Sequence, residues 1–479
     1  MAEYGRFGWR TAVTMAVVAI GVVVGMIVIG NASDSDSRPH PRPTSSGAPS
    51  MATLVFATWG SDEELGAYQK IVDAYNERST VVDVRVVGYS DPETMMNAID
   101  SGQIDPDVFL LRQDDLAATM AAERNQPLQD LMDARGVHVS DSFLREGINA
   151  FSAADDLQCM PYTASPMVMY YNKDLIDFDR MARRGQPVPN EDHSSFSLDA
   201  FRAAAQYASR PGTHAKGVEI APTLSGLAPF VYSGSGHLFD DDTQPTSLAL
   251  GNATDAIRDT LEVLRDPKIT LSSEQLERKS ALEWFEAGKL GMIAGYRDLT
   301  PVLRGTPGLH FDVLPMPSLG SSATIGQMTG VCLAKGPRDR VAQAADFLVD
   351  LIGDKAVNLV TKTGATVPAN LDVAFHGFLK QVPPAHPRVF TVAQRSIVPP
   401  PIDVDWAKLQ SNVRAGIEAL FTEPVLDDLS SALTDIDDQS RVVLDPSYQP
   451  SESPSGSPSG STDSSAGGSS SRSDAPSDD

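Results

Sequence analysis

The sequence has only two cysteines, Cys159 and Cys332, among its 479 residues. They show no CxxC or Cys/His spacing, which argues against a structural zinc site. No cysteine lies near the N-terminus, so lipid attachment at that end is excluded. If the body of the protein lies outside the cell, the two cysteines could form a disulfide, but their spacing leaves both states open.

Catalytic motifs are also missing. The sequence contains no GxSxG, HExxH or P-loop pattern, and the stretch DLQCMPYT around Cys159 has no signature of a nucleophile. We therefore expect no enzyme activity, no cofactor and no metal. A cell-wall carbohydrate enzyme of an unrecognised type remains an open alternative.

Basic residues are few: 38 Lys and Arg stand against 63 Asp and Glu, which gives a formal net charge of -25. Such a surface repels phosphate backbones and argues against a nucleic-acid partner, whereas a neutral or cationic solute is easier to accommodate. Hydrophobic residues make up 41% of the chain and charged residues 21%, as in a soluble globular body.

The N-terminal segment contains one long apolar run. Residues 11–30 carry no charge, and they follow Arg10 and precede Asp34. This length spans a bilayer as a helix, and the charge distribution leaves the remaining chain outside the cell. We expect residues 1–30 to form a transmembrane signal anchor that holds the body on the extracellular face of the membrane. Cleavage after Ala32, which would release the body, is the alternative.

Two flanking segments lack the residues needed for a core. Residues 31–50 are rich in Ser, Pro and Gly, and residues 445–479 contain no aliphatic residue larger than alanine. We expect a disordered spacer and a disordered Ser/Gly/Pro/Asp tail.

The globular body opens with an alternating pattern. The apolar run 53–58 is followed by a capping-box sequence at 61–64, and the segment 82–86 alternates as a strand does. A second helix is predicted from Pro92 and a third strand at 108–111. This β-α-β-α-β order predicts a parallel sheet.

The predicted strand ends carry groups suited to a polyol. Ligands of open α/β sheets gather at the carboxyl ends of the strands. These ends present Trp59, Ser61, Asp62, Arg112, Gln113, Asp114 and Asp115, of which we expect Trp59, Ser61, Asp62, Gln113 and Asp114 to bind the ligand. An indole can stack on a sugar ring, and carboxylates accept hydrogen bonds from hydroxyls. Two alternatives to ligand binding remain open: Trp59 is a core residue, and Asp62 caps the following helix.

The body resembles the family 1 extracellular solute-binding proteins, the group that includes the maltose-binding protein. The matching stretches occur in the order TLVFATWGSDEELGAYQKIVDAYNE, SGQIDPDVFLL, QPLQDL, MPYTASPMVMYYNKDLI, FEAGKLGMIAGY, FDVLPMPSLGSSATIGQMTGVCLAKG and TGATVPAN. The resemblance covers most of the chain.

This resemblance implies an α/β fold of the bilobal periplasmic-binding-protein type (type II), with two lobes joined by a hinge. Lobe 1 would comprise residues 51–163 and 330–380, and lobe 2 residues 164–329 and 390–444. The chain would cross between them at 162–171, at 330–335 and near 383–402. Tyr162, where the first crossing begins, joins the candidate ligand-binding residues.

Further candidate ligand-binding residues follow from the resemblance. Stretches that line the family's cleft correspond to PFVYSGSGHLF, with Phe230, Tyr232 and Gly234, and to AGYRDLTP, with Tyr296, Arg297 and Asp298. Trp406 lies where relatives place an aromatic that stacks on sugar. Tyr296 with Arg297 departs from the aromatic-rich pattern of maltose binders. This pair leaves room for an acidic or unusually polar sugar.

Adjacent tyrosines at 170 and 171 raise the alternative of ferric iron. Neighbouring side chains of a strand point to opposite faces of the sheet, which argues against a shared ion.

The sequence thus predicts a monomeric extracellular receptor that captures a sugar or oligosaccharide between two lobes and delivers it to the permease subunits of an ABC importer. The alternatives are a membrane-anchored ligand sensor and a receptor for a non-sugar solute such as a polyol or iron.

Overall fold

The computed structural model describes residues 51–209, 212, 214–424 and 426–449. The predicted anchor at 1–30, the predicted spacer at 31–50 and the predicted tail from residue 450 onward lie outside the described residues. Within the described ranges, no helix has the length and apolar character needed to cross a membrane. The start of the predicted tail is described, and there the Arg441 guanidinium lies 4.7 Å from the centroid of the Tyr448 ring.

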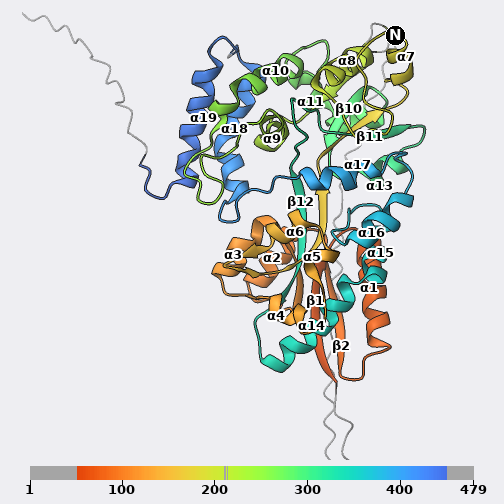
Figure 1. Cartoon of the computed structure of the whole chain (residues 1–479), viewed down its shortest axis with the longest axis vertical. Coiled ribbons are helices and arrows are strands. Elements are labelled where there is room, and N and C mark those ends of the chain that lie inside the picture. Colours follow the sequence, from red (N-terminus) through yellow and green to blue (C-terminus); the bar gives the residue numbers. More distant parts are fainter. Residues whose placement is uncertain (1–50, 210–211, 213, 425, 450–479) are drawn as a thin grey trace, which may run out of the picture. The chain divides into compact units, whose positions relative to one another are not determined.

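The body consists of two lobes, each built on its own sheet (Figure 1). The sheet of lobe 1 has the order β2–β1–β3–β12–β4, and β7 also pairs with β12. Its strands are β1 (Ala52–Trp59), β2 (Val82–Tyr89), β3 (Val108–Arg112), β4 (Asn125–Gln126), β7 (Met160–Pro166) and β12 (Gly326–Ala334). β1 is parallel to β2 and β3, whereas β12 is antiparallel to β3, β4 and β7.

The predicted β-α-β-α-β order at the start of the body is confirmed. Helix α1 (Asp62–Asn76) begins after Ser61, and the Ser61 and Glu64 side chains form the predicted capping box. Helix α2 (Pro92–Asp100) begins after Asp91, whose carboxylate accepts a hydrogen bond from the Thr94 amide. The remaining helices of lobe 1 are α3 (Leu116–Ala121), α4 (Gln129–Asp133), α5 (Val139–Ser142), α6 (Arg145–Ala150), α14 (Arg338–Ile352), α15 (Asp354–Thr361) and α16 (Leu371–His376).

Cys159 and Cys332 form a disulfide inside lobe 1, which settles the question that their spacing left open. Val331 on β12 lies opposite Met160 on the antiparallel strand β7. Cys332, which follows Val331, therefore lies opposite Cys159, which precedes Met160. Both cysteines are fully buried in the core of lobe 1.

The sheet of lobe 2 has the order β11–β8–β10–β9, with strands β8 (Val168–Asn172), β9 (Lys216–Glu219), β10 (Leu290–Gly295) and β11 (Phe311–Pro315). Both faces of this sheet are buried. Tyr170 belongs to the core on one face and Tyr171 to the core on the other. The two hydroxyls therefore cannot reach the same ion, and the shared-tyrosine basis of the iron alternative fails.

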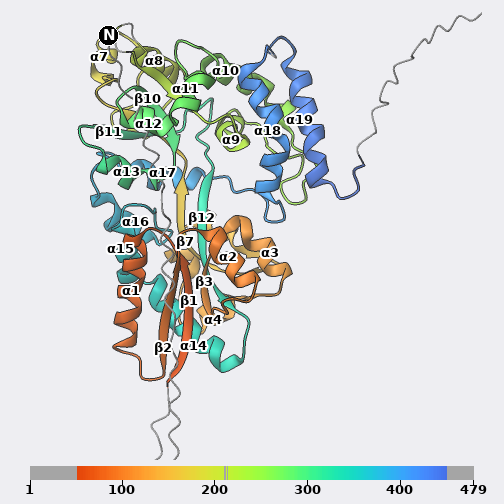
Figure 2. The same cartoon turned by 180° about the vertical axis from the view of Figure 1, so that it is seen from behind.

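Helices surround the second sheet. They are α7 (Phe178–Ala182), α8 (Leu198–Ala208), α9 (Leu224–Ser233), α10 (Thr254–Leu264), α11 (Ser273–Arg278), α12 (Ala281–Glu286), α13 (Leu299–Gly305), α17 (Arg388–Ala393), α18 (Trp406–Thr422) and α19 (Leu429–Leu444). The C-terminal helices α18 and α19 pack beside α9 and α10 (Figures 1 and 2).

Extended segments join the lobes. β7 continues into β8 after Met167, and β12 runs antiparallel beside β7 between the two sheets (Figure 2). At β12 the chain passes from lobe 2 to lobe 1 near the start of the strand. Ile325 still packs in the core of lobe 2, whereas Met328 already packs in the core of lobe 1. This crossing therefore precedes the predicted segment 330–335, of which residues 330–334 pair with β3 and β4 inside the first sheet.

Candidate ligand-binding cleft

A cavity of about 830 Å³ lies where the strand ends of the two lobes face each other. Trp59 at the end of β1 and Gln113 after β3 line it from lobe 1, while Ala221 after β9 and Tyr296 after β10 line it from lobe 2. All four positions follow the carboxyl ends of parallel strands, where ligands of α/β sheets collect. The volume falls in the range of small-molecule sites.

Four aromatic side chains line this cavity: Trp59, Tyr232, Tyr296 and Trp406. Each is half-buried, because part of the side chain packs on the adjoining core. Trp406 is held at the first position of α18, where Asp405 caps the helix through the Lys408 amide. The side chains can therefore offer flat surfaces to the apolar face of a sugar ring.

Two hydrogen bonds with neighbouring strands hold the turn after β10 in place. The Tyr170 hydroxyl lies 2.8 Å from the Tyr296 carbonyl oxygen and donates to it, and the Arg297 amide donates to Ser165 Oγ at 2.9 Å. These bonds hold Tyr296 and Asp298 in the cavity wall.

Hydrogen-bonding groups complete the lining. Gln410 lies one helical turn after Trp406, and its Oε1 accepts a hydrogen bond from Ser225 Oγ at 2.7 Å. Gln113 Nε2 donates to the Pro400 carbonyl at 3.3 Å. The carboxylates of the lining are Glu64, Asp114 and Asp298. Such a mixture of aromatic faces and polar acceptors suits a polyhydroxyl ligand.

Burial raises the pKa of Asp114, and the charges of Asp115 and Asp405 raise it further, while Arg112 lowers it. Burial also raises the pKa of Asp298, against the Leu299 amide, which lowers it. Both residues remain exposed to solvent at the cavity surface, so the raised pKa values reflect partial desolvation by the cavity walls and not a fully buried charge.

Six of the eleven predicted ligand-binding residues line the cavity. They are Trp59, Gln113, Asp114, Tyr232, Tyr296 and Trp406. Their part in binding stays a prediction, but the structure brings them together from both lobes.

The other five lie elsewhere. Ser61 and Asp62 are exposed at the start of α1, where Ser61 Oγ bonds to Glu64. Tyr162 is buried in the core of lobe 1, and Phe230 is buried among the helices of lobe 2. Arg297 is fully buried between two phenylalanine rings outside the cavity. Packing in the lobe cores keeps the three buried side chains out of the cavity lining, whereas Ser61 is engaged in helix capping and Asp62 lies on the exposed first turn of α1.

Several lining residues were missed from the sequence. Glu64 was read only as the partner in a capping box, although it also faces the cavity. Gln410 could have been found, because it lies four residues after Trp406 on the same helix face. Asp298, by contrast, belongs to the AGYRDLTP stretch that the resemblance indicates, and it does line the cavity. Ser225, on α9, carried no sequence signal.

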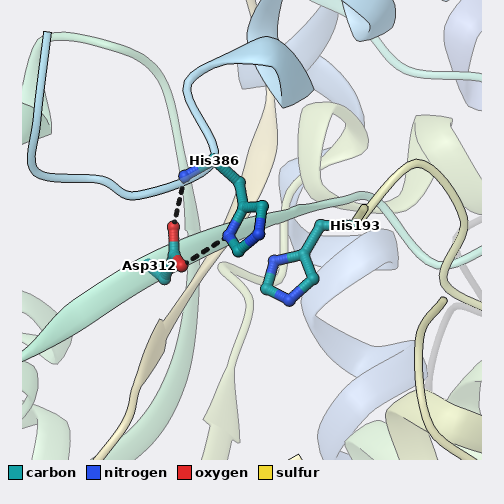
Figure 3. Close-up of side chains that lie close together, drawn as sticks. All are labelled: His193, Asp312 and His386. Atoms are coloured by element: carbon teal, nitrogen blue, oxygen red, sulfur yellow. Dashed lines mark hydrogen bonds and ion pairs between the residues drawn. The ribbon is translucent and has the colours of Figure 1, made fainter. Parts of the chain in front are cut away.

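His193, Asp312 and His386 form a separate group, and each offers an atom that could bind a metal ion, all within 4.8 Å of one another (Figure 3). His386 Nδ1 lies 2.7 Å from Asp312 Oδ2, and the His386 amide donates to Asp312 Oδ1 at 3.0 Å. His193 Nδ1 donates to the Val313 carbonyl at 3.0 Å, and the two imidazole rings stack with centroids 3.8 Å apart. These bonds engage both Nδ1 atoms and both carboxylate oxygens and clamp the chain at His386 onto β11, and they leave the imidazole Nε2 atoms as the positions open to an ion.

This clamp predicts a loss of stability at mildly acidic pH. Burial lowers the pKa of His193, and His386 and Lys173 lower it further, while the Val313 hydrogen bond and Asp312 raise it. Below about pH 6.5 the unfolded chain binds a proton that the folded imidazole resists, so the free energy of unfolding falls as the pH drops. Above that pH the group has no such effect.

The measurement is the urea midpoint at pH 8, 7, 6 and 5. His193→Asn retains an N–H donor for the Val313 carbonyl but cannot titrate, so its midpoint should decline less between pH 7 and pH 5 than that of the natural protein. Equal declines in the two proteins would show that His193 does not contribute.

Comparisons with known proteins agree with this architecture. A sequence profile of the family described as bacterial extracellular solute-binding protein matches residues 70–386. No curated protein matches the chain.

Solved structures share the fold. The ABC substrate-binding protein Lmo0181 of Listeria monocytogenes, solved with cycloalternan, has a TM-score of 0.67 at 17% identity, covering 82% of this chain and 99% of that chain. The cyclic alpha-maltosyl-1,6-maltose binding protein of Arthrobacter globiformis has a TM-score of 0.66 at 17% identity, covering 82% and 99%. The GacH receptor of Streptomyces glaucescens, solved unliganded and with acarbose, has a TM-score of 0.63 at 18% identity, covering 82% and 98%.

At these identities the solved structures establish the fold, and the predicted bilobal α/β architecture is confirmed. The profile match extends over more than half of the 479 residues, from the first helix of lobe 1 to the clamp at His386. The chain belongs to the bacterial extracellular solute-binding proteins.

Proposed function

We propose that this protein is the substrate-binding receptor of an ABC importer and that it captures a sugar or oligosaccharide in the cavity between its lobes. The observation that carries the proposal is the set of four aromatic side chains that line this cavity beside hydrogen-bonding groups and carboxylates. Relatives in fold with solved structures are described as binding maltose, cycloalternan and acarbose, which supports a carbohydrate ligand.

The capture mechanism follows from the position of the cavity. Its walls come from both lobes, so a solute that contacts both walls stabilises the arrangement in which they approach each other. A permease that engages only this arrangement would accept the receptor only after capture. The affinity then reflects the free energy of the lobe movement as well as the contacts.

We place the body on the extracellular face of the membrane, held by the predicted helix at 1–30 or released by cleavage after Ala32. The charge pattern around the apolar run supports this location, and so does the disulfide, because disulfides persist in oxidising compartments. The receptor would act as a monomer beside the permease subunits.

The test is isothermal titration calorimetry of the full-length chain in a sugar-free neutral detergent, against mono- and oligosaccharides, polyols, amino acids and ferric citrate. We expect saturable binding of one carbohydrate class, with the sugar recovered unchanged. Trp59→Ala and Trp406→Ala should each weaken binding by about ten- to hundredfold, because a buried aromatic contact is lost.

Phe375→Ala serves as the matched control, because Phe375 is an exposed aromatic outside the cavity lining. The sugar affinity of this variant should equal that of the natural protein. Binding of amino acids or ferric citrate alone would refute the carbohydrate proposal. Conversion of the sugar during the titration would instead favour an enzyme.

A further inference from the structure

The cavity has an unbalanced charge. Its lining contains the carboxylates of Glu64, Asp114 and Asp298, and Arg112 is the one basic side chain among the described residues that line it. The Arg112 guanidinium is already engaged by Asp115, with Nε–Oδ2 and Nη2–Oδ1 distances of 2.9 and 3.2 Å. Asp115 offsets this positive charge, which still stabilises the ionised Asp114, and the three carboxylates leave the lining acidic.

The acidic groups of the two lobes oppose each other. Asp405 of lobe 2 is close enough to Asp114 of lobe 1 for its charge to act on that carboxyl, and Glu64 of lobe 1 acts in the same way on Asp298 of lobe 2. Like charges that approach each other while water leaves oppose association. A neutral solute leaves this repulsion in place when the lobes approach.

The carboxylates also have free acceptor capacity. Within the described part of the chain, the Asp114 carboxylate has no hydrogen-bond partner, and Asp298 does not cap the helix that it precedes, although the nearby Leu299 amide stabilises its charge. By contrast, Glu64 and Asp405 already accept backbone hydrogen bonds at their helix starts. Asp114 therefore has its full acceptor capacity, and Asp298 part of its own, left for a ligand.

Arg297, which from the sequence suggested an acidic sugar, contributes no charge to this lining. Its side chain is fully buried and donates to the Gly364 carbonyl and to Gln381 Oε1, at 2.9 and 3.0 Å. The acidic sugar that the pair Tyr296 and Arg297 left open therefore loses its support, and the charge of the cavity has the opposite sign.

The aromatic side chains of the cavity are also compatible with a cationic ligand. Tyr296 and Trp406 line the cavity from lobe 2 and Trp59 from lobe 1. Faces of such rings attract cations as well as sugar C–H surfaces. A ligand that combines a pyranose ring with an ammonium group would use both properties.

We propose that the solute of this cavity is a cationic carbohydrate, an amino sugar or amino-oligosaccharide whose ammonium group is held by Asp114 and Asp298 from opposite lobes. The inference rests on the proposed function and specifies the substrate class. The ammonium would give the carboxylates of the two cavity walls a common positively charged partner, so charge complementarity favours the approach of the lobes on this ligand.

The experiment uses ligands matched in all but charge. Glucosamine, N-acetylglucosamine and glucose, with their di-, tri- and tetrasaccharides, are titrated into the full-length chain by calorimetry at pH 7 and low salt. The amine should bind about ten- to hundredfold more tightly than its acetylated and hydroxyl counterparts, because hydrogen bonds between charged groups are stronger than those between neutral groups. This advantage should shrink as ionic strength rises.

Variants locate the effect. Asp114→Asn and Asp298→Asn should each reduce the advantage of the amine about tenfold while changing the affinity for the acetylated sugar little. Asp130→Asn, which removes an exposed carboxylate on α4 outside the cavity, should leave the advantage unchanged.

The two proposals fail in distinguishable ways. Equal or tighter binding of the neutral sugars, or an unchanged advantage in both aspartate variants, would overturn the cationic ligand and leave the sugar receptor standing. If no member of the series and no other carbohydrate binds, the proposed function is wrong and this inference falls with it.

Discussion

Replacing Arg297 by alanine is expected to lower the free energy of unfolding by about 3–5 kcal/mol. The guanidinium lies 4.6 Å from the centroid of Phe378 and 4.8 Å from that of Phe390, and it bonds to Gly364 and Gln381. Alanine would leave a cavity between the rings and would deprive two buried oxygens of their donor. Both changes are among the most destabilising in protein interiors.

Arg297→Met separates packing from polar contacts. Methionine fills the space between the rings and removes a buried charge that has no carboxylate partner, so it should be clearly less destabilising than alanine. The measurement is the urea midpoint and slope of the three proteins at pH 7. If alanine and methionine lower stability equally, or if alanine costs less than about 1 kcal/mol, the packing role assigned to Arg297 is incorrect.

The same substitution reports on the cavity. Tyr296 and Asp298 flank Arg297 and line the cavity, so loss of the Arg297 anchor should loosen this wall. We expect Arg297→Ala to weaken ligand binding even in protein that remains folded, although the side chain contacts no ligand.

Removal of the disulfide should have an effect of similar size. Cys159 and Cys332 are separated by 173 residues in the sequence, so their link restricts a very long loop of the unfolded chain. The Cys159→Ala, Cys332→Ala double variant should lose about 2–5 kcal/mol of unfolding free energy. Urea unfolding monitored by far-UV circular dichroism measures this loss.

Reductant supplies the matched control. Dithiothreitol should lower the midpoint of the natural protein toward that of the double variant and should not affect the variant itself. An identical midpoint for the oxidised natural protein and the double variant would show that the disulfide adds nothing to stability.

The fold of lobe 1 was largely predictable because its signals are local. The alternation of Val82, Val84 and Val86, the capping box at Ser61 and the apolar run at 108–111 each specify one element over a few residues. The rule that ligands gather at strand ends then placed Trp59 correctly beside the cavity.

The misplaced candidates show where local signals stop. Phe230 and Tyr232 lie two residues apart on α9, yet only Tyr232 reaches the cavity, because the helix turns their side chains in different directions. Arg297 lies between two lining residues and points the other way. Its partners Phe378 and Phe390 lie more than 80 residues further along the chain.

The sequence by itself determined the order of the first strands and helices of lobe 1 and the strand ends at which a solute can bind, because these depend on patterns within short segments, and the resemblance to a known family added the two-lobed α/β class. Only the tertiary structure decided which side chains face the cavity, that Cys159 pairs with Cys332, and that the lining is acidic. Those outcomes depend on contacts between segments distant in the sequence, which determine the side on which each residue finds its packing partners.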